Sequence, residues 1–194
     1  TLTPLVFYFL EHHDAESPEI GQILSDLESY VVRRFVCGLT TKSYNRTFTT
    51  RLLAELAKER RSDATALREK LKNLTGDSQH WPSDAEFEQG WCYRALYQGK
   101  NTSKVRAILE ALELCQRTTK QELLPLPDGL TVEHVMPQKW EANWTIPDNS
   151  AEAVADRKRL LHSIGNLTLV TSAFNSALSN EAFAVKRPEI VTTS

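Results

Sequence analysis

The sequence contains no long hydrophobic run and few cysteines. No apolar stretch approaches the roughly 18 to 20 residues needed to cross a bilayer, and the N-terminus lacks the residue order of a signal peptide. We therefore expect a cytoplasmic protein with no membrane partner. The three cysteines, Cys37, Cys92 and Cys115, are odd in number and form no Cys-x-x-Cys pair. This pattern argues against a disulfide framework, fits a reducing compartment and predicts no structural zinc site.

The sequence also contains a single methionine and has a small net charge. The only methionine is Met136 and the chain starts at Thr1, so we expect a piece of a longer polypeptide. The formal net charge of −2 supplies no global attraction to nucleic acid, so any DNA contact must come from local basic patches. The candidate DNA-binding residues in these patches are Arg33, Arg34, Lys42, Arg157 and Lys158. The alternative for each is an ion-paired or solvated helix face.

Residues 1 to about 117 have the apolar periodicity of helices. Ser17 can cap a helix that starts at Pro18, and Gly38 can end it. Ser83 and Glu86 have the spacing of a capping box for a later helix. Apolar residues at three- and four-residue spacing mark the helical faces, among them Ile20, Leu24, Leu27, Tyr44, Phe48, Leu52, Leu56, Leu67, Leu71, Val105 and Leu109. We predict a helical bundle domain over residues 1–122.

The pattern changes at residues 123–129, where two prolines and an Asp-Gly pair cannot continue a helix. Beyond this boundary, residues 130–135 and 166–170 are β-prone. The long connection between them contains a helical pattern from about Ser150 to Leu161, and another helix is expected after the second strand. The sequence thus predicts a mainly α chain with a small β element, and a second domain over residues 123–194.

Four polar residues in this second domain supply groups for phosphodiester hydrolysis. Glu133 and His134 lie on the first predicted strand, Asn166 starts the second and Asn175 lies on the following helix. The reaction needs an activated water and a cation that neutralises charge on the phosphoryl oxygens. A neutral His can take the proton from water, and carboxylate and Asn oxygens are ligands that Mg²⁺ prefers. Because strand neighbours face opposite sides, Glu133 and His134 can share a site only at a bend or strand end.

Three segments carry a resemblance to a known family: Val-Glu-His-Val-Met-Pro-Gln (132–138), Ile-Gly-Asn-Leu-Thr-Leu (164–169) and Asn-Ser-Ala-Leu-Ser-Asn (175–180). They resemble the C-terminal HNH domain of GmrSD-like restriction enzymes, a group that includes SspE-like enzymes and attacks modified foreign DNA. Residues 27–42 resemble the helical segment that precedes this domain. The resemblance implies an HNH-type ββα-metal fold over residues 123–194, a bacterial host, and a partner N-terminal nucleotide-hydrolysing and modification-sensing domain that this chain lacks.

The resemblance also implies a role for each site residue. His134 is the expected general base, Glu133 and Asn175 the ligands of Mg²⁺ or Mn²⁺, and Asn166 the residue that orients His134 or its loop. Lys186 is expected to help at the phosphate. The implied function is a metal-dependent endonuclease that nicks or cuts double-stranded DNA in antiviral defence. The alternatives are a catalytically inactive HNH-like module that binds DNA or a partner, and a helical protein–protein adaptor.

Three further residues near this set have less specific interpretations. His162 lies at a predicted helix end, where a cation interacts favourably with the helix dipole, and a minor role in binding DNA is the alternative. Trp140 and Trp144 could stack on bases. In a connection of this length, we expect both indoles to pack beneath the loop instead.

Overall fold

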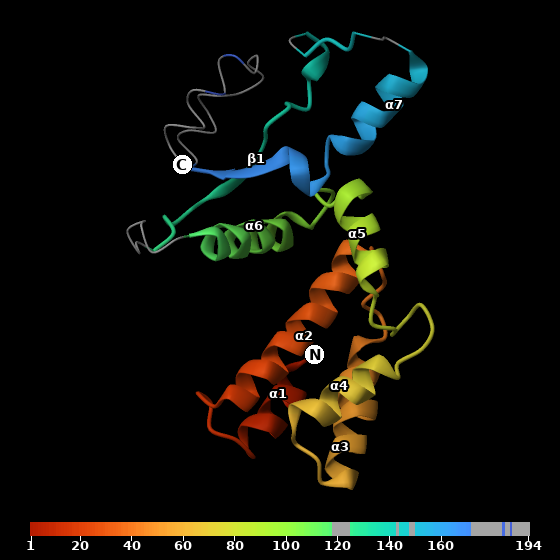
Figure 1. Ribbon diagram of the computed structural model, residues 1–194, viewed down its shortest axis with the longest axis vertical. Coiled ribbons are helices and arrows are strands. Elements are labelled where there is room, and N and C mark those ends of the chain that lie inside the picture. Colours follow the sequence, from red (N-terminus) through yellow and green to blue (C-terminus); the bar gives the residue numbers. More distant parts are fainter. Residues whose placement is uncertain (118–124, 143, 148–149, 172–183, 185–186, 188–194) are drawn as a thin grey trace. The chain divides into compact units, whose positions relative to one another are not determined.

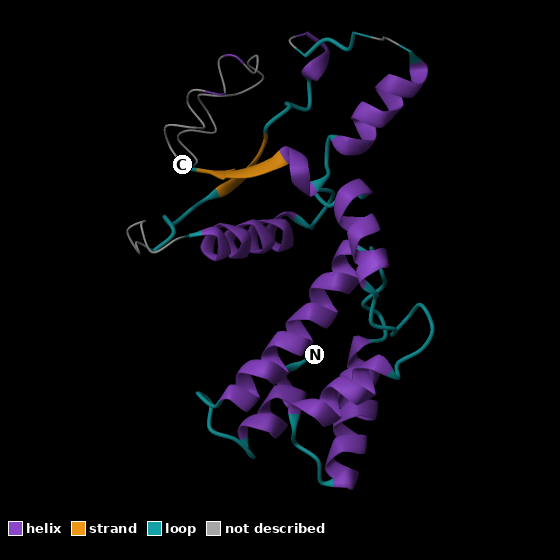
Figure 2. Cartoon of the chain, in the orientation of Figure 1, coloured by secondary structure: helices purple, strands orange, loops and turns teal. Residues whose placement is uncertain are grey.

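The computed structural model describes residues 1–117, 125–142, 144–147, 150–171, 184 and 187. The chain divides into two compact units, Thr1–Gly90 and Trp91–Ser194. In the described parts of both units helices dominate, and one two-stranded sheet is present (Figures 1 and 2). The prediction of a mainly α chain with a small β element is therefore confirmed. None of the described helices is both long and apolar enough to cross a membrane.

The first unit is built from helices. They are α1 (Thr3–Leu10), α2 (Pro18–Val36), the π-helix η1 (Arg46–Leu53), α3 (Ala54–Glu59), α4 (Ala64–Lys72) and most of α5 (Asp84–Tyr93). The Ser17 hydroxyl caps α2 by accepting the Ile20 N–H at 3.3 Å, as the sequence predicts. Gly38 follows the end of α2 with a φ of 68°, a conformation that favours glycine.

The core of this unit consists of the apolar faces of its helices. Its largest fully buried apolar side chains are Leu5, Phe9, Ile23, Tyr30, Phe48, Leu52, Leu56, Leu67 and Leu71. Most of them belong to the stripes recognised in the sequence. The stripe of Phe48, Leu52 and Leu56 is buried as predicted, but its first part is a π-helix rather than an α-helix. Periodicity did not reveal the wider turn, because residues four apart share one face in both helix types.

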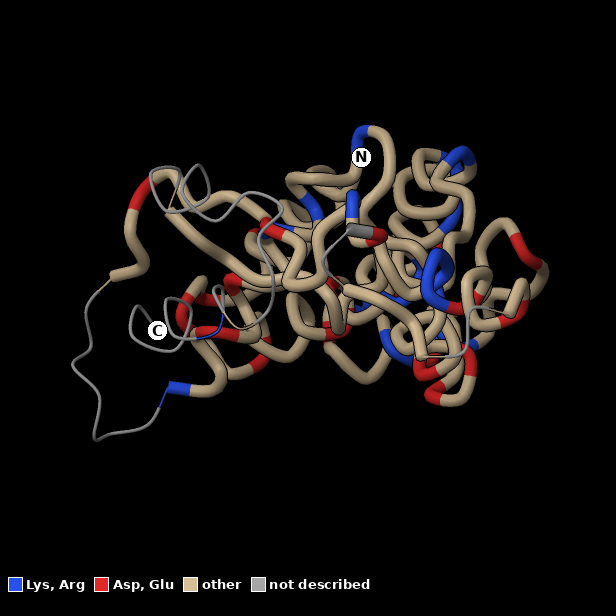
Figure 3. The backbone as a smooth tube through the Cα atoms, turned by 90° about the horizontal axis from the view of Figure 1, so that it is seen from above, with Lys and Arg blue, Asp and Glu red and all other residues tan. Residues whose placement is uncertain are grey.

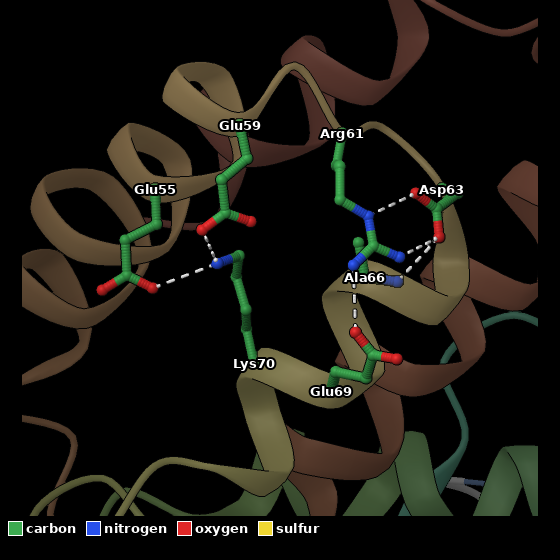
Figure 4. A network of polar contacts seen from close by, with 7 residues as sticks. All are labelled: Glu55, Glu59, Arg61, Asp63, Ala66, Glu69 and Lys70. Atoms are coloured by element: carbon green, nitrogen blue, oxygen red, sulfur yellow. Dashed lines mark hydrogen bonds and ion pairs between the residues drawn. The ribbon is translucent and has the colours of Figure 1, made fainter.

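Ion pairs cover the solvent side where α3 meets α4 (Figure 4). The Lys70 ammonium lies 2.7 Å from a Glu59 oxygen and 3.4 Å from a Glu55 oxygen. Hydrogen bonding to Glu59 raises the pKa of Lys70. Arg61 pairs with Asp63 at 3.0 Å, and the hydrogen bond from this guanidinium lowers the pKa of the Asp63 carboxyl. The carboxylates of these pairs stay 41–47% exposed to water, so the pairs contribute little to stability individually.

The second unit contains the sheet. Its described elements are α6 (Thr102–Gln116), β1 (Thr131–His134), the 3₁₀ turn η2 (Trp140–Ala142), α7 (Ala151–Leu160), the 3₁₀ turn η3 (Ile164–Asn166) and β2 (Leu167–Val170). The strands pair antiparallel, and α6 packs against both of them (Figure 1). Ser150 caps α7 by accepting the Ala153 N–H at 3.2 Å. Strand, long connection with a helix, and strand therefore follow in the predicted order.

The division between the units lies at residue 90, whereas the sequence pattern places a boundary at residue 122. The difference concerns residues 91–122, which include α6 and belong to the unit that contains the sheet. Its Val105 side chain is fully buried, and its contacts with β1 and β2 explain why the helix belongs there. The two prolines after residue 123 indicate where a helix cannot continue. They do not indicate which surface buries α6, the helix before them.

Candidate functional site

His134 is the last residue of β1 and lies opposite Leu167, the first residue of β2. Burial alternates along β1, so that Val132 and His134 face the interior while Thr131 and Glu133 are half-buried. Only 4% of the surface of His134 is exposed. The β-prone sequence therefore places the imidazole at the point where regular pairing of the two strands ends.

Asn166 holds the chain that leaves β1. Its side-chain oxygen accepts the Met136 N–H at 2.8 Å, and its amide nitrogen donates to the Met136 carbonyl at 3.0 Å. The same nitrogen donates to the Leu161 carbonyl at 2.8 Å, and the Asn166 carbonyl accepts the Val135 N–H at 2.9 Å. The Asn166 amide thus satisfies both backbone groups of Met136, as a strand neighbour would. It ties the turn before β2 to the two residues after His134.

The His134 ring is held by two aromatic neighbours. Its Nε2 lies 3.0 Å from the Nδ1 of His162, and the two ring planes meet at 77°. The Tyr97 ring packs edge-on against His134, with ring centroids 5.1 Å apart. The His162 carbonyl accepts the N–H groups of Leu96 and Tyr97 at 2.9 and 3.2 Å, respectively. The turn that contains His162 thereby positions both neighbours of the His134 imidazole, His162 itself and Tyr97.

Sequence reasoning missed the contact between His162 and His134. The two histidines are 28 residues apart, and the connection between them has no fixed spacing that would indicate a pair. The only available signal was that His162 lies four residues before Asn166. Such a residue could have been expected near the strand end that Asn166 holds.

Glu133 faces away from His134. It lies opposite Thr168 in the sheet, on the half-buried face of β1. Within the described residues, no group of three or more His, Cys, Asp and Glu side chains is placed to hold a metal ion. The second expected ligand, Asn175, and the expected phosphate contact, Lys186, both lie outside the described residues. The carboxylate and amide oxygens of Glu133 and Asn175 fit Mg²⁺ or Mn²⁺ chemically, and the metal site stays a prediction.

The two candidate DNA-binding arginines of α2 are engaged within the first unit. Arg34 is 0% exposed, and its guanidinium donates to the carbonyls of Thr40, Asp77 and His80 at 2.7–3.2 Å. It therefore organises the loops around it, and the burial contradicts the prediction that it contacts a phosphate. Arg33 forms an ion pair of 2.6 Å with Asp84 and stays partly accessible.

The other candidate basic residues differ in their surroundings. Lys42 and Lys158 are exposed. Arg157 donates to the Trp144 carbonyl, and its guanidinium lies over the Trp140 ring, 5.2 Å from the centroid. Trp140 is itself buried, as expected of an indole beneath a loop. In Figure 3 basic and acidic positions are both distributed over the described chain, in keeping with the small net charge.

The second unit thus presents a histidine at a strand end, secured by an asparagine from the neighbouring strand's entry turn. Residues 81–193 match the family of GmrSD restriction endonucleases, C-terminal domain. The match spans more than half of the chain, and the chain belongs to this family. Membership implies a restriction-endonuclease type of function, a hydrolase that acts on DNA. The chain matches no curated protein and no solved structure at a significant level.

Proposed function

We propose that the second unit is an HNH-type DNA endonuclease domain of the ββα-metal class that uses Mg²⁺ or Mn²⁺. Family membership supports the nuclease activity. The observation that carries the HNH assignment is that Asn166, directly before β2, binds both backbone groups of Met136, two residues after His134 at the end of β1. An antiparallel pair of strands that presents a histidine in this way needs only the following helix to complete the ββα order.

His134 acts as the general base in this proposal. It takes a proton from the water that attacks the phosphorus, the P–O bond to the leaving sugar oxygen breaks, and that oxygen takes a proton from solvent while His134 returns its own proton to solvent. Asn166 acts through the backbone, because its amide keeps Val135 and Met136 in place and so determines where β1 ends. Burial of the His134 ring limits its rotation, so the ring loses less conformational entropy when it is aligned with the attacking water.

Glu133 and Asn175 would hold the cation, which when bound supplies positive charge against the developing charge on the phosphoryl oxygens. Glu133 directly precedes His134, the last residue of β1, and lies on the opposite, half-buried face of the strand, so only a bend at the strand end would bring its carboxylate to the side of His134. Lys186 is the proposed further contact to the phosphate. Lys42 and Lys158 are exposed and Arg33 is partly accessible, so these three can supply the sequence-independent attraction to the DNA backbone.

The same proposal places the protein in the bacterial cytoplasm as the effector of a modification-dependent defence enzyme. An N-terminal nucleotide-hydrolysing and sensing domain would control it. These statements follow from the resemblance of residues 132–138, 164–169 and 175–180 to SspE-like and other GmrSD-like enzymes.

Nicking of supercoiled plasmid DNA tests the proposal. The native chain should convert the supercoiled form with Mg²⁺ or Mn²⁺, and EDTA should abolish the conversion. His134→Ala should lower the rate by about 10²- to 10⁴-fold, the usual contribution of a general base. The control is His12→Ala, which removes an exposed histidine of the first unit. Equal cleavage by the native chain and His134→Ala would refute the assignment, and DNA binding without cleavage would support an inactive binding module instead.

A further inference from the structure

His162 is a second histidine in the site, and the family resemblance assigns no role to it. Its Nδ1 lies within hydrogen-bond distance of the His134 Nε2, at 3.0 Å. A hydrogen bond between two imidazoles places one proton between the two nitrogens, so one ring donates and the other accepts. The contact therefore determines which nitrogen of His134 carries hydrogen.

Only one of the two arrangements is compatible with a general base at His134. If His162 donated, its N–H would occupy the lone pair of the His134 Nε2. The Nδ1 of a neutral His134 would then carry the hydrogen, and neither nitrogen could take a proton from water. If His134 donates its Nε2–H to the His162 Nδ1, the basic nitrogen of His134 is Nδ1. Transfer of a proton from water to Nδ1 then gives an imidazolium whose Nε2–H still donates to His162. The hydrogen bond becomes charge-assisted and stronger as the proton arrives.

Hydrogen bonds hold the backbone around His162, so its ring is kept in place as an acceptor. Its carbonyl accepts two N–H groups from Leu96 and Tyr97, and the following Ser163 donates its N–H and its hydroxyl to the Leu160 carbonyl. Asn166 additionally binds the Leu161 carbonyl. The backbone on both sides of His162 is therefore held. The aromatic ring of Tyr97 packs edge-on against the His134 ring of the pair.

We propose that His162 is a positioning residue that accepts the His134 Nε2–H, fixes the ring and leaves Nδ1 as the base. The inference rests on the proposed nuclease function of His134. In the same way, a residue that binds the second nitrogen of a catalytic or metal-bound histidine sets its tautomer and orientation. His162 uses a neutral acceptor for this purpose.

Two substitutions of His162 separate positioning from packing. His162→Phe keeps an aromatic ring but removes the acceptor, and kcat should fall by about 10- to 100-fold with little change in KM. His162→Asn restores an amide oxygen close to the place of Nδ1 and should retain activity within about threefold of the native chain. Equal urea midpoints for the two variants would show that folding does not explain the difference. The inference is wrong if His162→Phe cleaves at the native rate, or if His162→Asn loses as much activity as His162→Phe.

Comparison with His134→Ala distinguishes the two proposals. Inactive His134→Ala together with fully active His162→Phe would overturn the positioning role alone, whereas active His134→Ala would overturn both. A measurement independent of cleavage uses the nitrogen shifts of the His134 ring in NMR spectra. The native chain should show hydrogen on Nε2, and His162→Phe should show a mixture of the two tautomers. A native His134 with hydrogen on Nδ1 would refute the inference.

Discussion

Replacing Asn166 by Ala should destabilise the second unit by about 2 kcal/mol. The side chain forms three hydrogen bonds, to the Met136 N–H, the Met136 carbonyl and the Leu161 carbonyl. Each contributes roughly 0.5–1.5 kcal/mol net, so together they account for about 1.5–4.5 kcal/mol. Asn166 is half-buried, and water can reach some of the groups that lose a partner. We therefore expect the lower half of that range.

Urea unfolding and amide hydrogen exchange measure the effect of Asn166→Ala. A loss of about 2 kcal/mol in the second unit should accelerate exchange of the Met136 N–H by about 30-fold, since 1.4 kcal/mol corresponds to a factor of 10. Asn166→Asp should be no more stable than the Ala variant, because a carboxylate oxygen would face two carbonyls. Asn73→Ala, at an exposed position, is the control. An Asn166→Ala protein with native stability and native protection of Met136 would refute this account of how β1 ends.

Two further predictions concern the first unit. A Cβ at Gly90 would lie 2.8 Å from the Val36 carbonyl oxygen, so Gly90→Ala should lower the urea midpoint at a cost of about 1–3 kcal/mol. The matched change is Gly21→Ala, in an exposed helical position where an added Cβ would meet nothing within 4 Å, and it should raise the free energy of unfolding by about 0.5–1 kcal/mol. Equal effects of the two substitutions would contradict the packing argument. Burial raises the pKa of Tyr30 from the usual 10.0 to about 12, so the associated stability is complete below pH 10 and is lost as the pH rises toward 12. The free energy of unfolding, measured at about pH 9 and about pH 11.5, checks this prediction. Tyr30→Phe should lose less stability between these two pH values than the native chain, and an equal loss would contradict the prediction.

Helix starts were predictable because the interactions that make them are local. Ser17 and Ser150 each accept an N–H three residues ahead. Ser83 and Glu86 exchange hydrogen bonds at 2.8 and 3.3 Å in the predicted capping box. A cap is satisfied within a few residues of chain, so the pattern of residue types contains the whole interaction.

Burial of charged residues was not predictable in the same way. Arg33 and Arg34 are neighbours on α2 with the same side-chain chemistry, yet one pairs with Asp84 near the surface and the other is fully buried. The carbonyls that bind Arg34 come partly from the loop that contains Asp77 and His80, more than 40 residues away. Helical periodicity places the two arginines on adjacent faces but does not show what each face meets.

The sequence by itself determined the helix caps, the two strands and the order of elements, which depend on residue type and spacing over short distances. The resemblance of residues 132–138 and 164–169 to a known family marked His134 and Asn166 as candidate site residues. The tertiary structure decided that α6 belongs with the sheet, that Asn166 binds Met136 across 30 residues and that His162 contacts His134 across 28. Those contacts depend on how a connection of variable length folds back, which spacing along the chain does not specify.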